Sequence, residues 1–201
     1  MPDVLPGSSQ RTPEYAVAPL FVDRWSPRAM SGDAMPHTVL MSLFEAARWA
    51  PSSFNHQPWR FLYAPRATTH WPTFLDLLIP YNQAWAQHAA VLIVLLAKTT
   101  MDRHDEPAPT HALDAGAAWQ NLALQGWLHG LVVHGMRGFD AEKAAQVLAV
   151  PDAYRVLMMI AVGTPGDPAN LPANLRDRDV PSPRKALTEI AWEGPFREPL
   201  R

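Results

Sequence analysis

The chain has no cysteine. Disulfide bonds, thiolate nucleophiles and metal or iron–sulfur centres with cysteine ligands are therefore excluded. Neither sign of charge dominates, because 17 Lys and Arg residues stand against 19 Asp and Glu residues, for a net charge of −2. This balance disfavours a protein that binds nucleic acid through a basic surface.

Long hydrophobic runs are also missing. The longest apolar run, residues 89–97, is too short to cross a bilayer, which takes about 20 apolar residues. Residues 1–19 are polar and proline-rich, with no apolar signal core. We expect a soluble, cytoplasmic protein with no membrane partner.

What the chain does have is a hydrophobic content of 48% over 201 residues, which suits one folded domain with one sizeable core. Its 21 prolines cluster near both ends and within residues 99–109 and 163–183, and so mark loops and arms. We expect residues 1–20 to be a flexible arm and residues 21–201 to be a single domain, whose extended C-terminal arm begins at Gly163.

Hydrophobic periodicity predicts helices and strands that alternate along the chain. The predicted helices are residues 36–49, 70–78, 82–88, 110–130, 140–149 and 186–192. The predicted strands are residues 59–64, 89–97, 131–134 and 156–162, the second of them buried on both faces. Within the longest helix Leu113, Ala117, Leu124 and Leu128 share one face. The pattern indicates a sheet covered by helices on both faces.

Residues 24–28 read Arg-Trp-Ser-Pro-Arg and place two guanidinium groups and a hydroxyl close together. Arginine presents a planar fork of donors that matches phosphate oxygens, so the segment is a candidate anion site. Arg184 and Lys185 add two cations in a late loop and could close a phosphate clamp. The alternative in both places is a pair of solvated surface charges.

Residues 51–59 read Pro-Ser-Ser-Phe-Asn-His-Gln-Pro-Trp and are the most informative stretch. Two prolines stiffen a loop between a helix and a strand. Its Ser, Asn and Gln side chains can contact a heteroaromatic edge that both donates and accepts hydrogen bonds. An ordinary polar turn remains the alternative.

Residues 135–140 join a strand to a helix and contain two glycines, Gly135 and Gly138. Glycine lets a ligand approach backbone N–H groups closely, and the helix that follows adds a positive dipole. The alternative is a plain strand–helix turn. His104, Asp105 and Glu106 with His111 resemble a metal cluster only faintly, because prolines interrupt the segment, and we expect no metal site.

Taken in order, these segments resemble the nitroreductase family over residues 20–195. The family's Arg-x-Ser-x-Arg segment is matched by residues 24–28, and its Pro-Ser-Ser-x-Asn-x-Gln-Pro-Trp segment is matched in full by residues 51–59. Asn82 precedes the buried strand, a Gly-Phe-Asp turn begins at Gly138, and a basic pair begins at Arg184, as in the family.

The resemblance implies an α+β fold with a mixed, mainly antiparallel sheet, a C-terminal arm exchanged in a homodimer, and FMN bound at the subunit interface. Arg24, Arg28 and Arg184 or Lys185 would hold the ribityl phosphate, and Ser26 would position that end. Arg28 would also stabilise negative charge on the reduced flavin. No protein acid or base would be obligatory, since flavin N5 carries the chemistry.

The resemblance further implies that Asn82 bonds the pyrimidine edge of the flavin and that backbone N–H groups at Arg137 and Gly138 approach N5. Ser52, Ser53 and Asn55 would come from the other subunit. The implied cofactor-binding set is Arg24, Trp25, Ser26, Arg28, Pro51, Ser52, Ser53, Asn55, Asn82, Arg137, Gly138, Arg184 and Lys185. Phe54 and His56 would face the substrate.

The implied activity is FMN-dependent oxidation of NADPH or NADH, with ping-pong reduction of nitroaromatic, quinone or related small-molecule acceptors. Relatives that carry out dehydrogenation, dehalogenation or oxygen-dependent flavin chemistry offer an alternative, as does a flavin-binding module with little turnover. Three residues depart from the family pattern: Trp25, Arg137 and Trp85, the last at a place where some relatives carry a lysine linked to nicotinamide-cofactor binding.

Overall fold

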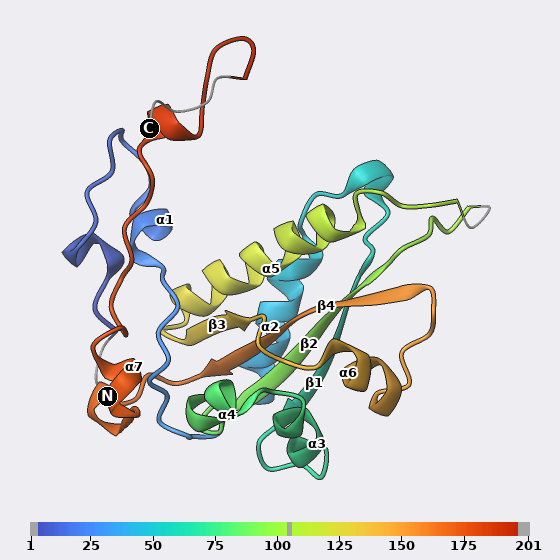
Figure 1. Cartoon of the computed structure of the whole chain (residues 1–201), viewed down its shortest axis with the longest axis horizontal. Coiled ribbons are helices and arrows are strands. Elements are labelled where there is room, and N and C mark those ends of the chain that lie inside the picture. Colours follow the sequence, from blue (N-terminus) through green and yellow to red (C-terminus); the bar gives the residue numbers. More distant parts are fainter. Residues whose placement is uncertain (1–3, 104–105, 197–201) are drawn as a thin grey trace.

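A computed structural model describes residues 4–103 and 106–196, and Figure 1 shows how its elements are arranged. The helices are α1 (Pro19–Asp23), α2 (His37–Arg48), α3 (Trp71–Asp76), α4 (Pro80–Ala86), α5 (His111–Leu128), α6 (Ala141–Val147) and α7 (Ala173–Arg176). The strands are β1 (Trp59–Pro65), β2 (Val91–Lys98), β3 (Val132–Met136) and β4 (Tyr154–Gly163). Every predicted strand is present, and all predicted helices except 186–192 are.

The strands form one sheet in the order β1-β2-β4-β3, and each neighbouring pair is antiparallel. Strand β2 lies inside the sheet, and seven of its eight residues are buried. Its apolar residues do not alternate with polar ones because both faces of the strand are covered, as predicted. The predicted α+β fold with a mainly antiparallel sheet is confirmed.

Helices cover both faces of the sheet. Because successive side chains of a strand point to opposite faces, β2 supplies two separate cores. Ile93 and Leu95 pack in the core that contains residues of α2 and α5, whereas Leu92 and Val94 pack in the core that contains residues of α3, α4 and α6. Within the described residues, no helix is long and apolar enough to cross a membrane.

Helix α5 turns a different face to the sheet from the one that the leucine spacing marks. Its buried residues include Ala115, Ala118 and Gly126, whereas Leu113 is 74% exposed and Leu128 is 66% exposed. Small residues let the helix approach the sheet closely, and a Cβ on Gly126 would lie 2.3 Å from Cγ2 of Val133. The face that carries the leucines is therefore an apolar surface of the single chain.

The chain after β4 corrects the expected start of the C-terminal arm. Residues 164–179 fold back onto the body, because Leu171 and Leu175 are buried in the same core as α3 and α4. The extended arm begins only after that point. The helix expected over residues 186–192 is a single 3₁₀ turn, Leu187–Glu189.

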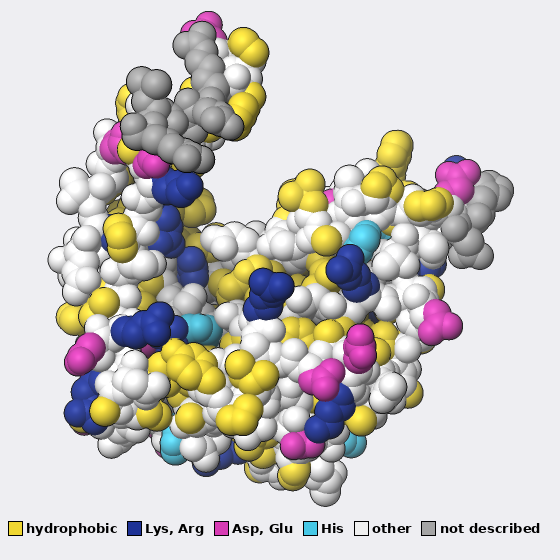
Figure 2. Space-filling model, viewed as in Figure 1, with side chains coloured by type: hydrophobic (Ala, Val, Ile, Leu, Met, Phe, Trp, Pro, Cys, Tyr) yellow, Lys and Arg dark blue, Asp and Glu magenta, His cyan; other side chains and the backbone are white. Residues whose placement is uncertain are grey.

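The two ends of the chain run side by side and project from the body (Figure 1). Nε of Arg11 donates to the carbonyl oxygen of Ser182 at 2.8 Å, and the backbone N–H of Leu187 donates to Oε1 of Glu14 at 3.0 Å. We call these two segments, which contain residues 11–14 and 182–187, the paired arms. Figure 2 shows a hollow between the paired arms and the body, with Lys and Arg side chains along the arm side.

Candidate functional site

A cavity of about 500 Å³ lies between the paired arms and strand β3, and five arginines line it. They are Arg11, Arg24, Arg28, Arg178 and Arg184. We call this space the arginine cavity. Trp25 and Ser26 also line it, so the structure brings together five of the predicted cofactor residues: Arg24, Trp25, Ser26, Arg28 and Arg184. Lys185 instead lines a neighbouring, more apolar cavity of about 870 Å³ between the arms.

The cations of the arginine cavity crowd one another. Burial lowers the pKa of Arg24, and the positive charge of Arg184 lowers it further. The pKa of Arg11 is lowered by burial first and then by the charges of Arg184 and Arg24. A bound anion would relieve this repulsion, and phosphate is an anion whose geometry guanidinium groups match.

Arg11 fastens the arms to the cavity. Its Nη1 donates to the carbonyl oxygens of Val22 and Arg24 at 3.0 and 3.1 Å, in addition to the bond from Nε to Ser182. Trp25 adds a second anchor, since its indole Nε1 donates to the carbonyl oxygen of Leu5 at 2.8 Å. Sequence reasoning missed Arg11, because a single arginine in a proline-rich stretch carries no spacing signal.

Two buried or half-buried side chains hold the backbone beside Arg28. Asp179 accepts hydrogen bonds from the backbone N–H groups of Arg28 at 2.8 Å and Ala29 at 3.3 Å, and its Oδ1 lies 3.5 Å from Nη1 of Arg28. His134 of β3 bonds through Nδ1 to the carbonyl oxygen of Pro27 at 2.9 Å. Asp179 was not predicted from the sequence.

Asn82 and Gly138 meet at a second part of the site. Asn82 is buried at the start of α4, and its Nδ2 donates to the carbonyl oxygen of Gly138 at 2.9 Å. A Cβ on Gly138 would lie 2.6 Å from that Nδ2 and 2.7 Å from Cδ1 of Ile79, so no larger residue fits without movement. Arg137 beside it is exposed.

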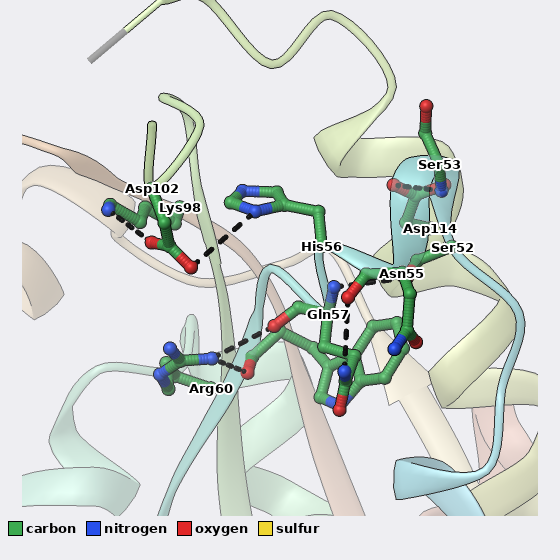
Figure 3. A network of polar contacts seen from close by, with 10 residues as sticks. Ser52, Ser53, Asn55, His56, Gln57, Arg60, Lys98, Asp102 and Asp114 are labelled. Atoms are coloured by element: carbon green, nitrogen blue, oxygen red, sulfur yellow. Dashed lines mark hydrogen bonds and ion pairs between the residues drawn. The ribbon is translucent and has the colours of Figure 1, made fainter. Parts of the chain in front are cut away.

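The loop of residues 51–57 is a compact polar structure at the start of α5, and Figure 3 shows its contacts. The hydroxyl of Ser52 accepts from the backbone N–H of Gln57 at 3.0 Å. Oδ2 of the buried Asp114, in the first turn of α5, accepts from the backbone N–H of Ser53 at 3.3 Å and from the hydroxyl of Thr110 at 3.1 Å. Asp114 is a further residue that sequence reasoning missed.

The same loop has a strained backbone. Phe54, Asn55 and Gln57 have φ of 52°, 55° and 51°, in the left-handed region that non-glycine residues seldom adopt. Such conformations persist only where the surroundings over-determine them, and they gather at functional sites. Phe54 is also 93% exposed.

His56, the other predicted substrate residue, points inward. Its side chain is 4% exposed, and Nδ1 lies 3.9 Å from Oδ2 of Asp102 (Figure 3). Trp85 is also away from solvent, because it is 1% exposed and packs against the ring of His134 at 4.7 Å between centroids. It therefore belongs to the core and reaches no nicotinamide cofactor in this conformation.

The arginine cavity and the loop of residues 51–57 do not meet within one chain. Figure 1 places the turn of Ser53–Asn55 where α5 begins, whereas α1 and the segment after it lie toward the end of that helix. An 18-residue helix is about 27 Å long.

Of the faint metal cluster, His104 and Asp105 lie outside the described residues, and among the described ones no three His, Cys, Asp or Glu side chains gather to hold a metal.

Comparison with known proteins identifies the family to which this architecture belongs. The model of the nitroreductase family matches residues 22–71 and 66–164. The chain belongs to the nitroreductase family. A crystal structure described as an oxidoreductase containing FMN is similar to it with a TM-score of 0.92 and 44% identity, over 94% of this chain and 97% of that one.

Two curated relatives share less of the sequence. An uncharacterized 15.4 kDa protein of Mycolicibacterium smegmatis is 35% identical over 129 residues, which are 64% of this chain and 86% of the relative. An NADH dehydrogenase of Thermus thermophilus is 26% identical over an alignment of 175 positions, which covers 72% of this chain and 84% of the relative. The predicted membership of the nitroreductase family is thereby confirmed.

Proposed function

We propose that the chain is an FMN-dependent oxidoreductase that oxidises NADH or NADPH and reduces nitroaromatic, quinone or related acceptors. The observation that carries the proposal is the arginine cavity. It brings Arg24, Ser26 and Arg28 together with Arg184, which lies at least 156 positions further along the chain. The FMN in the similar crystal structure and the NADH dehydrogenase among the relatives support the cofactor and the electron donor.

The residues present fit the phosphate of FMN. Guanidinium groups supply charged donors from several directions, and the pKa values of Arg11 and Arg24 are lowered by burial and then by the charges of neighbouring arginines. A volume of about 500 Å³ is also within the range of small-molecule sites. In this assignment Arg24, Arg28 and Arg184 hold the phosphate, Ser26 positions the ribityl end and Trp25 lines the wall, with Lys185 adding charge nearby.

The other half of the site comes, in this proposal, from a second copy of the chain. Pro51, Ser52, Ser53 and Asn55 of one copy would reach the flavin held by its partner, and the exposed Phe54 would face the acceptor together with the loop around His56. The exposed leucine face of α5 supports a homodimer, since large exposed apolar surfaces mark interaction sites.

FMN bound at this site would supply the redox chemistry, namely hydride and electron transfer between the nicotinamide and the acceptor in a ping-pong cycle. The chain's residues bind and orient the cofactor. Asn82 and the backbone N–H groups at Arg137 and Gly138 would face its ring system.

An absorbance spectrum tests this proposal. The purified chain, loaded with FMN and kept anaerobic, is expected to show oxidised-flavin bands that bleach when NADH or NADPH is added and return with menadione or nitrofurazone. Oxygen consumption and product analysis then separate simple reduction from oxygen-dependent flavin chemistry. Protein that takes up no FMN, or whose bound FMN neither donor bleaches, would contradict it.

A further inference from the structure

The backbone of residues 26–29 is gripped from two sides by titratable side chains. On one side the Asp179 carboxylate, with a side chain only 1% exposed, accepts from two successive backbone N–H groups, those of Arg28 and Ala29. On the other side the ring of His134 bonds to the carbonyl of Pro27, the residue between Ser26 and Arg28. Two consecutive peptide groups, Pro27–Arg28 and Arg28–Ala29, are therefore fixed by side chains from distant elements.

We propose that Asp179 and His134 are positioning residues that set the direction in which Ser26 and Arg28 present their side chains to the phosphate of FMN. This inference rests on the proposed function. Neither residue needs to touch the cofactor, since each acts through the backbone of residues 26–29, which we call the clamped segment.

The protonation states suit such a clamp. A carbonyl oxygen only accepts, so Nδ1 of His134 must carry the proton that it shares with Pro27. Burial, with a smaller effect from Arg28, lowers the pKa of His134 to about 4 despite the carbonyls of Pro27 and Ser26. The ring is therefore neutral at pH 7 and adds no charge that would repel Arg28.

Asp179 supplies the complementary charge. Its carboxylate faces the guanidinium of Arg28 and two backbone donors, and a carboxylate bound by several N–H groups is held in one orientation. It also lies directly before Val180, where the chain departs to line the arginine cavity and reach Arg184. The seating of the C-terminal arm and the direction of Arg28 are thus fixed by one residue.

The test compares FMN with riboflavin, which lacks only the phosphate. Dissociation constants for both ligands are measured by fluorescence quenching on apoprotein of the full chain. Asp179→Ala and His134→Leu are expected to weaken FMN binding about 10-fold or more while changing riboflavin binding far less. Asp179→Asn and His134→Asn, which keep an acceptor and a donor respectively, are expected to recover part of the loss.

A double variant separates action through Arg28 from a general effect. If Asp179 works through the clamped segment, the loss in Arg28→Ala/Asp179→Ala is smaller than the product of the two single losses. Thermal unfolding of each apoprotein checks that the variants fold. If Asp179→Ala or His134→Leu does not fold, Asp179→Asn and His134→Asn are tested in their place.

The outcomes decide two different claims. FMN that fails to bind the wild-type chain overturns the proposed function and this inference with it. If wild-type chain binds FMN, then the clamp alone is overturned by variants that keep full FMN affinity, by equal losses for FMN and riboflavin, or by fully multiplicative losses in the double variant.

Discussion

The loop of residues 51–57 is held by one local contact and by one partner in α5, whereas the arginine cavity also depends on contacts between the two ends of the chain. Ser52 bonds Gln57 across five positions, and Asp114 bonds Ser53 across 61. Arg11 bonds Ser182 across 171 positions, and Asp179 bonds Arg28 across 151. One half of the proposed site thus needs only the chain as far as α5, and the other half exists only once the two ends have come together.

The two halves also differ in how they store energy. The loop holds three non-glycine residues at positive φ, with Asp114 fixing its start. The arginine cavity instead concentrates like charges: burial first, and then the charges of neighbouring arginines, lower the pKa values of Arg24 and Arg11. Backbone strain keeps the loop in shape without a ligand, while charge repulsion makes the cavity a place that an anion stabilises.

Removing a cavity arginine should give the largest effect. Arg28→Ala is expected to weaken FMN binding by 10- to 100-fold, because a charge-assisted hydrogen bond contributes about 1.5–3 kcal/mol. Flavin titration of the apoprotein measures the change. Arg48→Ala is the matched control, since that arginine pairs with Glu45 on the surface of α2 and should leave FMN affinity as it is. Equal affinities for wild type and Arg28→Ala would remove Arg28 from the site.

Loss of the buried carboxylate beneath the loop should come next. Asp114→Ala leaves the backbone N–H of Ser53 and the hydroxyl of Thr110 without their acceptor. We expect the free energy of unfolding to fall by about 1–2 kcal/mol. Urea denaturation followed by tryptophan fluorescence reports it. An unchanged midpoint would mean that the loop does not depend on Asp114.

Backbone strain in the loop predicts a smaller effect on stability, in which glycine is the more stabilising replacement instead of alanine. Phe54→Gly and Phe54→Ala both remove the exposed ring, but only glycine adopts a φ of 52° freely. The glycine variant should therefore be the more stable by about 1 kcal/mol in urea denaturation. If the alanine variant were equally stable or more so, the loop would not be strained at this position.

The smallest expected effect is a net dependence of stability on pH, because two groups of the arginine cavity oppose each other. His134 has a folded pKa of about 4, below the usual 6.5, so the unfolded chain binds more protons between these values and stability rises with pH there. Burial raises the pKa of Asp179, so the folded chain binds more protons above pH 3.8 and stability falls with pH there.

Single variants separate these two contributions. His134→Asn should flatten the rise in stability from pH 4 to 6.5, whose slope for one group is at most about 1.4 kcal/mol per pH unit. Asp179→Asn should instead steepen the rise just above pH 3.8. Urea midpoints across pH 4–7 measure both. Parallel curves for wild type and His134→Asn would show that His134 does not titrate as its burial requires.

The same contrast explains what could be predicted from sequence. Strand β2 was predictable because a short continuous run of branched apolar residues is typical of a strand buried on both faces. The loop of residues 51–57 was predictable because its residues match a family pattern at the same spacing. Arg11 and Asp179 were not predictable, since their partners are set by the fold across most of the chain.

The sequence left one point of the fold open and misplaced another. Helix α5 carries apolar residues on more than one side, so its spacing could not show whether Leu113 or Ala115 faces the sheet. Residues 164–179 are rich in proline and polar residues, which favoured an extended arm, yet the segment folds back onto the body and buries Leu171 and Leu175 in the core.

Subunit complementation tests most directly whether one site is built from two chains. Arg28→Ala and Asn55→Ala chains, each deficient in FMN binding alone, would be unfolded together, refolded as a mixture and titrated with FMN. If each site takes its arginines from one chain and its loop from the other, mixed dimers regain one intact site, and about one quarter of wild-type sites return. A mixture that binds no more FMN than its separate components would contradict a site shared between two chains.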